Sequence, residues 1–200
     1  MQRIPFLLFC LFLLTVIPVQ TIEKTRFNTT HPLDERRLEN GDIILRYGKG
    51  LWSQFFRDVS RRDKRFSHAG IVVREEGAFY VIHAAAAELT GVGKVTCDPL
   101  GAFLEASSDY AVYRLAVSGP VRQKIAHNAR NYLGVSFDTS FDLSEQERLY
   151  CTEMVMQAVN KATGFVVIRP TAASGIAVVA PDNCYEHRLV RSVIAGPGES

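Results

Sequence analysis

Short apolar runs separated by turn-forming residues dominate the chain after its N-terminal segment. Residues 41–46 (Gly-Asp-Ile-Ile-Leu-Arg) form a turn followed by an apolar run, and residues 69–73 and 79–82 are two further runs rich in β-branched and aromatic residues. The Glu-Glu-Gly sequence at residues 75–77 lies between the last two runs and predicts a hairpin. Residues 110–115 form another such run, so this part of the chain is predicted to be mainly strands.

Helical segments alternate with these strands along the chain. Pro120 opens a segment whose apolar residues recur at helical spacing until Gly134 ends it. Residues 51–65 form a basic candidate helix, and Asp98-Pro99 is a suitable start for a short helix that includes Leu104. Three helices are therefore predicted before residue 140.

The clearest amphipathic helix starts at Cys151. Apolar positions recur at i, i+3, i+4, i+7, i+8 and i+11 from this residue, and Gly164 gives a C-terminal stop. Apolar runs at residues 165–168 and 176–180 follow, and residues 186–193 predict a last strand. The predicted fold class is α+β in one domain, with strands first, then a cysteine-bearing helix, then more strands.

The N-terminus has the organisation of a secretory signal peptide. After Arg3, residues 4–19 contain no charge and are almost wholly apolar, which is slightly short for a membrane-spanning helix. We expect residues 1–20 to be a signal peptide, residues 21–40 a polar leader and residues 41–195 the folded domain. The protein would then be exported to the periplasm or cell envelope. The alternative is an uncleaved N-terminus, which would be its only membrane contact.

Composition limits the classes of partner. The chain has 200 residues, of which 47% are apolar, and 23 basic residues against 21 acidic ones give a net charge of +2. This balance argues against a nucleic-acid binder, whose affinity depends on clustered Lys and Arg. Outside the signal peptide, Cys97, Cys151 and Cys184 have spacings too long for a CxxC redox or zinc site, so no metal or other cofactor is predicted. We expect Cys151 to be free, and Cys97 and Cys184 to be either both free or bonded to each other.

A free cysteine at the start of a helix is a candidate nucleophile. The helix dipole and the free N–H groups there would favour the thiolate of Cys151. His68 begins one predicted strand and His83 ends the next, so pairing around the turn at residues 75–77 brings the two histidines side by side. His68 would then be the base and His83 the group that orients it. The alternative is a buried structural thiol and two histidines with ordinary hydrogen bonds.

Five segments form a set that points to one family. They are GDIIL at 41–45, FSHAGIV at 66–72, VIHA at 81–84, FDTSFD at 137–142 and LYCTEMV at 149–155. Together they resemble the permuted papain-like cysteine hydrolases of the YiiX/YaeF type, relatives of the NlpC-type cell-wall peptidases. The resemblance implies a circularly permuted papain-like, NlpC-like fold. In this fold a curved antiparallel sheet or open barrel packs against the cysteine-bearing helix, and the histidine strands precede that helix.

The resemblance also assigns roles. Cys151 matches the nucleophile, His68 the base and His83 the third polar position, where several relatives have Glu and the NlpC-type enzymes a second His. Ser67 and Tyr150, the neighbours of His68 and Cys151 in their motifs, are expected to contact substrate, and Tyr150 is equally suited to packing. If His68 shares a proton with Cys151, the thiol pKa should lie well below the free-thiol value of about 8.5.

Three further features have competing interpretations. Residues 144–147 (Ser-Glu-Gln-Glu) form a capping-box pattern, so a helix could start there and place Cys151 in mid-helix, whereas the resemblance implies a break before Cys151. Asp138 and Asp142 could suggest a cation, but carboxylates in such a loop are more often solvated or fix the loop. Basic residues within 57–65 could attract an anion, but interleaved acidic residues favour a solvated face.

The expected function is hydrolysis of an amide bond by an exported cysteine peptidase or amidase. Its partner would be a small peptide or amide substrate, such as a peptidoglycan-type peptide or cell-wall fragment, and no nucleic acid. Attack by Cys151 would give an acyl-enzyme, and His68 would deliver a proton to the leaving amine. The alternative enzyme is an acyl-lipid thioesterase or acyltransferase, which would need a long apolar groove. The alternative from another class is a catalytically silent binding module of the envelope.

Overall fold

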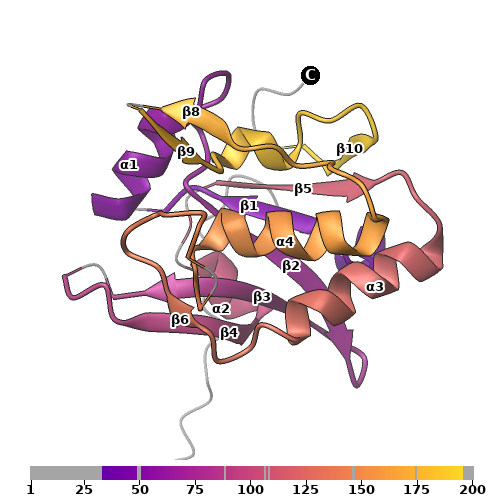
Figure 1. Cartoon of the computed structure of the whole chain (residues 1–200). Helices are drawn as coiled ribbons and strands as arrows, with labels where there is room; N and C mark the ends of the chain where they lie inside the picture. Colours follow the sequence, from indigo (N-terminus) through magenta and orange to yellow (C-terminus); the bar gives the residue numbers. More distant parts are fainter. Residues whose placement is uncertain are drawn as a thin grey trace, which may run out of the picture.

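The computed structural model describes residues 33–48, 51–87, 89–105, 107, 109–145, 147–173 and 175–195 (Figure 1). Along the chain the elements are η1 (Glu35–Arg37), β1 (Ile43–Arg46), α1 (Leu51–Val59), β2 (His68–Glu75), β3 (Ala78–Ala86), β4 (Gly93–Pro99), α2 (Leu100–Glu105), β5 (Tyr110–Leu115), α3 (Gly119–Arg130), β6 (Ser136–Phe137), β7 (Arg148–Leu149), α4 (Cys151–Thr163), β8 (Thr171–Ala173), β9 (Ile176–Val178), η2 (Pro181–Cys184) and β10 (Val190–Ile194). The signal peptide expected at residues 1–20 lies outside the described residues. Within the described ranges, no helix is long and apolar enough to cross a membrane.

An eight-stranded sheet forms the frame of the domain. Its strand order is β10-β5-β1-β2-β3-β4-β6-β7, and neighbouring strands are antiparallel except β6 and β7. The strands curl into a half-barrel, and α4 lies across β2 and β3 with α3 beside it (Figure 1). A curved sheet packed against the cysteine-bearing helix confirms the predicted fold class.

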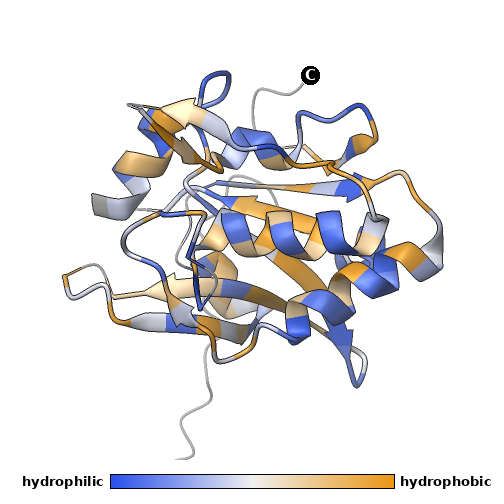
Figure 2. Ribbon diagram, in the orientation of Figure 1, coloured by the Kyte–Doolittle hydropathy of each residue, from blue (hydrophilic) through white to orange (hydrophobic). Residues whose placement is uncertain are grey.

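The hairpin predicted around residues 75–77 is confirmed. Strands β2 and β3 pair antiparallel, and Glu76 and Gly77 both have positive φ in the turn, which suits the twist of a tight hairpin. One row of apolar side chains, including Ile71 and Ile82, joins the core under α4, while the alternate row joins a second core that includes α2. Both faces of these strands are therefore buried, which explains their continuous apolar sequence and colour (Figure 2).

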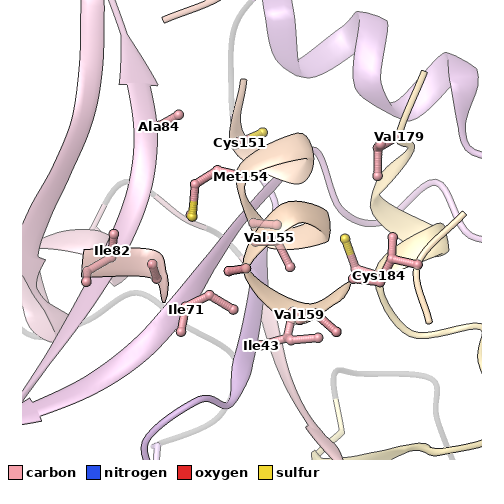
Figure 3. Close-up of a cluster of buried hydrophobic side chains, with 14 of the residues drawn as sticks. Ile43, Ile71, Ile82, Ala84, Cys151, Met154, Val155, Val159, Val179 and Cys184 are labelled. Carbon is pink, nitrogen blue, oxygen red and sulfur yellow. The ribbon is translucent and has the colours of Figure 1, made fainter. Parts of the chain in front are cut away.

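Helix α4 begins at Cys151 because a strand leads directly into it. Leu149 ends β7, and Tyr150 is the extended N-cap residue with φ −95° and ψ 171°. The helix start predicted at Ser144 is absent, because the N–H groups of Ser144 and Glu145 both donate to Asp142 in a turn. Figure 3 shows Cys151 at the start of α4, next to the buried cluster that the helix forms with the sheet. The break implied by the family resemblance is therefore present.

The predicted helix over residues 51–65 is wrong in its second half. Helix α1 ends at Val59, and the chain then turns toward the C-terminal segment. The carboxylate of Asp182 accepts hydrogen bonds from the backbone N–H groups of Arg61 and Arg62, at 2.7 and 3.0 Å. A long-range contact thus takes backbone donors that a continuing helix would have used.

Two other elements differ from the sequence prediction. The last strand, β10, begins at Val190 and not at residue 186, because the N–H groups of Tyr185 and Glu186 donate to the carbonyl of Asp182 in a turn. Strand β4 was not predicted, since Asp98-Pro99 was interpreted only as a helix start. The short helix α2 does follow, but Asp98 remains in the strand.

Candidate active site

A chain of hydrogen bonds links two histidines to a carboxylate. His68 Nε2 lies 2.8 Å from His83 Nδ1, and His83 Nε2 lies 3.0 Å from Asp98 Oδ2. The Thr96 hydroxyl donates to the other oxygen of Asp98 at 3.1 Å. These residues come from three adjacent strands, β2, β3 and β4, so the sheet itself fixes the chain.

The carboxylate of Asp98 ends this hydrogen-bonded chain and determines which nitrogen atoms of His83 and His68 carry protons. An ionised carboxylate only accepts, so His83 donates from Nε2 and accepts at Nδ1 from the Nε2–H of His68. His68 then has no proton on Nδ1, which is the state of a general base. This hydrogen-bonded chain can therefore orient His68. The sequence predicted that role for His83 alone, and the structure adds Asp98 to it.

Gly70 allows β2 to approach closely the part of β3 that holds His83. The register pairs Ile71 with Ile82, so His68 and His83 are diagonal neighbours on β2 and β3. The sequence predicts that they lie side by side, without this diagonal offset. A Cβ on Gly70 would lie 3.1 Å from His83 Cβ and 2.5 Å from a methyl group of Val81. Any side chain at this position would displace the strand that holds His83.

Cys151 lies at the start of α4, next to β2 and the candidate base His68. It is the first residue of α4, so its N–H has no acceptor within the helix and can donate a hydrogen bond to an oxyanion. Its sulfur accepts hydrogen bonds from the backbone of Ala69, the residue after His68, and of Thr152. Both Cys151 and His68 line one cavity of about 140 Å³.

The lining of the cavity is mostly uncharged, with Arg46 as its cation. Aromatic side chains from α1 and β6 and the small residues at the end of β3 form its apolar walls, with Ser53, Ser67 and Arg46 as its other polar contributors. The full lining is Arg46, Gly48, Trp52, Ser53, Phe56, Ser67, His68, Ala84, Ala85, Ala86, Phe137 and Cys151. Its volume is close to that of an engineered cavity of about 150 Å³ that binds benzene, so it suits a group of a few non-hydrogen atoms.

Burial keeps both reactive groups neutral at rest. It raises the pKa of Cys151 to about 11, although hydrogen bonds from Ala69 and Thr152 and the charge of Arg46 oppose this. It also lowers the pKa of His68 well below 6.5, with further lowering by the charge of Arg46 and the electrostatic effect of His83. Desolvation of a residue that is 1% exposed therefore outweighs these opposing effects, and this argues against the low thiol pKa expected from the sequence.

Alkylation of Cys151 should reflect this neutral state. We expect its rate with iodoacetamide to be low at pH 7 and to rise steadily through pH 10, because the thiolate is the reactive form. The measurement is the pH dependence of labelling, followed by mass spectrometry of the Cys151 peptide, with N-acetylcysteine as the reference. A plateau reached below pH 8.5 would instead show a preformed thiolate–imidazolium pair.

The two predicted substrate-contact residues have different places. Ser67 is buried, lines the cavity and accepts a hydrogen bond from the Gly48 N–H at 2.9 Å. Tyr150 does not line it: its ring packs between Phe56 and Phe141, and its hydroxyl accepts from the Val179 N–H at 2.9 Å. Tyr150 thus supports the start of α4, the second of its two expected roles.

The other candidates have structural roles. The carboxylate of Asp138 accepts from the Ser140 and Asp142 N–H groups and fixes their loop. Among the described residues, no group of three or more His, Cys, Asp or Glu could hold a metal ion. Cys97, Cys151 and Cys184 are all free thiols, which agrees with the first of the two pairing alternatives.

Arg46 and Asp98 are the site residues that sequence reasoning missed. Arg46 ends β1 directly opposite His68, and its charge acts on Cys151, His68 and His83. Asp98 lies fifteen positions after His83, the separation that also divides His83 from His68, and it belongs to the unpredicted strand β4. Recognition of β4 as a third strand of the meander would have placed Asp98 beside His83.

Another buried carboxyl, that of Glu153, lies in the first turn of the cysteine helix. Glu153 is fully buried, and burial raises its pKa to about 7, against hydrogen bonds from the Tyr150 backbone and Gln157. The charges of Asp138 and Asp142 add to this increase. Glu153 therefore holds the N-cap residue that precedes Cys151 while its own ionised form is disfavoured.

This carboxyl should make stability depend on pH. Its pKa is higher in the folded state than its ordinary value of 4.5, so its contribution is full below about pH 4.5 and is lost as pH rises through about 7. Between pH 5 and pH 8, Glu153→Gln should lose less unfolding free energy than the wild type, by on the order of 2 kcal/mol. Denaturant unfolding at both pH values measures this, with exposed Glu147→Gln as control. Equal losses in all three proteins would contradict it.

The comparison with protein families places the chain in one class. Residues 37–188 match the family of permuted papain-like amidase enzymes, YaeF/YiiX, C92 family. The match covers most of the chain, and the fold and the order of histidine strands before cysteine helix agree with it. The protein therefore belongs to the permuted papain-like amidase family.

Two of the similar proteins are both called YiiX. The uncharacterized protein YiiX of Escherichia coli K12 is 31% identical over 133 residues, which are 64% of this chain and 61% of YiiX. The crystal structure of metalloprotein YiiX from Escherichia coli O157:H7 matches with a TM-score of 0.66 at 22% identity, over 78% of this chain and 96% of that chain. The structural match shows a shared fold, and the chain spans 61% of the curated relative's length.

Proposed function

We propose that the protein is an exported cysteine amidase that hydrolyses a small amide or peptide, such as a cell-wall fragment, through Cys151, His68 and the His83–Asp98 pair. The observation that carries this proposal is that Cys151 and His68 line the same cavity. The free N-terminus of α4 brings Cys151 there, and the histidine chain brings an unprotonated ring nitrogen. Membership of the amidase family supports the same chemistry.

The mechanism starts from neutral groups. As the Cys151 sulfur attacks the amide carbonyl, its proton moves to His68 Nδ1, and the Cys151 N–H donates to the developing oxyanion. The C–N bond then breaks, the leaving amine takes that proton, and a thioester remains on Cys151. His68 next takes a proton from water, the hydroxide attacks the thioester carbonyl, and the proton returns to the sulfur as the acid leaves.

The cavity volume favours hydrolysis of a small amide over the acyl-lipid alternative. An enzyme for long acyl chains needs a long apolar groove, whereas the cavity beside Cys151 is about 140 Å³. YiiX of E. coli O157:H7 is described as a metalloprotein, but the described residues of this chain bring together no metal-binding group of the usual kind. No step above depends on a metal.

The test is a screen with trapping of the acyl-enzyme. The purified full chain is incubated with cell-wall peptides, small amides and acyl esters, quenched in acid and analysed by mass spectrometry. We expect turnover of small amides and an acyl adduct on the Cys151 peptide. Turnover of long-chain esters alone would favour the acyl-lipid enzyme, and binding of wall fragments without any adduct would favour the silent binding module.

Asp98 offers a test of the proposed proton chain. Asp98→Asn can present its NH2 group to His83 Nε2, which reverses both hydrogen bonds and leaves a proton on His68 Nδ1. We expect kcat to fall on the order of 10²-fold, less than for a fully buried orienting aspartate, because the Asp98 side chain is 40% exposed. Asp98→Ala should lose less, since water can take the place of the carboxylate. Equal or reversed losses would show a purely structural role.

A further inference from the structure

Arg46 is a cation built into the wall of the candidate active site. It lies on β1 opposite His68, lines the cavity, and its charge acts on both Cys151 and the histidines. Nη1 donates to the Phe103 carbonyl at 3.0 Å, and the guanidinium lies 4.6 Å from the centre of the Phe103 ring. These contacts with α2 hold the side chain in place.

The guanidinium has unused donor capacity and, in the described part of the chain, no carboxylate within ion-pair distance. Its Nε is buried without a hydrogen-bond partner in the described part of the chain. Other arginines form ion pairs within 4.0 Å: Arg36, Arg62, Arg65, Arg114, Arg122, Arg130 and Arg148. Arg46 is not among the ion pairs of the described residues. A half-buried charge without a close counter-ion is costly, and burial lowers the pKa of Arg46 although the charges of Cys151 and Asp98 oppose this. An anion that enters the cavity would relieve this cost.

The shape of the cavity selects the kind of anion. Arginine presents a planar fork of N–H donors that matches a carboxylate with two parallel hydrogen bonds. The remaining lining is apolar or hydroxyl-bearing apart from His68 and Cys151, and its volume of about 140 Å³ holds only a few non-hydrogen atoms. A carboxylate there would lie within a few bonds of a carbonyl placed at Cys151.

We propose that Arg46 binds a carboxylate of the substrate, and that the substrate class is small amides with a free carboxylate a few bonds from the scissile carbonyl. This inference rests on the proposed function for the identity of the reaction. The binding step itself does not depend on turnover. Arg46 is therefore a specificity-determining residue, with a role different from the proton transfer assigned to His68, His83 and Asp98.

Two alkylating reagents of nearly equal size test this step without a substrate. Iodoacetate has a carboxylate and iodoacetamide has a neutral amide in its place, and both attack the same thiolate. The ratio of their rate constants at the Cys151 peptide therefore cancels any effect of Arg46 on thiol ionisation. We expect this ratio to exceed that of N-acetylcysteine by on the order of tenfold, the size of one charge-assisted hydrogen bond.

The variants should change the ratio in a fixed order. Arg46→Gln should return it to the value of N-acetylcysteine, and Arg46→Lys should retain part of the preference because it keeps the charge without the fork. Arg74→Gln is the matched control: Arg74 also lies over a phenylalanine ring, that of Phe79 at 5.3 Å, but it is exposed and outside the cavity. It should leave the ratio unchanged.

Three outcomes would overturn the inference. These are a wild-type ratio equal to that of N-acetylcysteine, equal slowing of both reagents in Arg46→Gln, and an equal loss of preference in Arg74→Gln. If Arg46→Gln does not fold, protection of wild-type Cys151 from iodoacetamide by propionate but not by propionamide replaces it, and equal protection contradicts the proposal. A high iodoacetate preference together with no hydrolysis of any carboxylated amide would retain the carboxylate site and reject the proposed amidase.

Discussion

Cys151→Ala is expected to abolish amide hydrolysis, with a loss of kcat on the order of 10⁶-fold, the size seen when a nucleophile of this kind is removed. The thiol is the group that forms the thioester, and no other nucleophilic side chain lines the cavity beside His68 except the hydroxyls of Ser53 and Ser67. Of these, Ser67 is already hydrogen-bonded to the Gly48 backbone. The measurement is kcat with a substrate from the amide screen, together with the loss of the acyl adduct.

Stability and the other thiols serve as controls for this variant. The change removes one buried sulfur atom at the start of α4, so the thermal unfolding midpoint should stay close to that of the wild type. Cys97→Ala changes a half-buried thiol on β4, outside the cavity, and should leave kcat unchanged. Activity retained in Cys151→Ala, or lost equally in Cys97→Ala, would remove Cys151 from its proposed role.

The elements that could be predicted from the sequence are those fixed by local pattern. Alternation of apolar runs with a Glu-Glu-Gly turn predicts the β2–β3 hairpin, and the helical period from Cys151 to Gly164 gives α4 with correct ends. The two motif histidines and the cysteine were assigned by resemblance, and the structure brings His68 and Cys151 to one cavity with His83 hydrogen-bonded behind them. Local pattern and motif together therefore predict the frame of the site.

What could not be predicted depends on contacts between distant segments. The end of α1 is set by Asp182, more than a hundred residues later in the chain. Arg46 reaches the site because β1 pairs with β2, and it had no motif to mark it. The raised pKa of Cys151 follows from the depth at which the half-barrel buries the sulfur, which the helix period alone does not reveal. Long-range burial and pairing thus determine the charge environment of the candidate site.

The geometry also changes one expectation about His83. Because relatives have Glu at this position, His83→Glu would be expected from sequence to retain part of the function. Here Asp98 Oδ2 lies 3.0 Å from His83 Nε2, so a carboxylate at position 83 would face a second carboxylate. A glutamate should therefore be tolerated only together with Asp98→Asn, which removes the like charge and supplies a donor.

His68→Ala is expected to lower kcat by between about 10⁴- and 10⁶-fold, because it removes the base that takes the thiol proton and later protonates the leaving amine. Burial lowers the pKa of His68 well below 6.5, so the wild-type base stays unprotonated in mild acid. The acid limb of kcat/KM in the wild type should therefore lie below pH 6.5, and an acid limb above that pH would contradict the neutral-imidazole state.

Rescue by imidazole separates a catalytic role from a structural one for His68. Added imidazole can enter the space left by the His68→Ala side chain and accept the proton from Cys151, so it should restore part of kcat in this variant. It should have no effect on His127→Ala, whose histidine is exposed on α3 and outside the cavity, and that variant should keep full activity. A folded His68→Ala protein with undiminished turnover would show that His68 and Cys151 do not act as a pair. In that event the silent binding module becomes the better account of the cavity, because a buried thiol with a pKa of about 11 has no other base beside it among the lining residues.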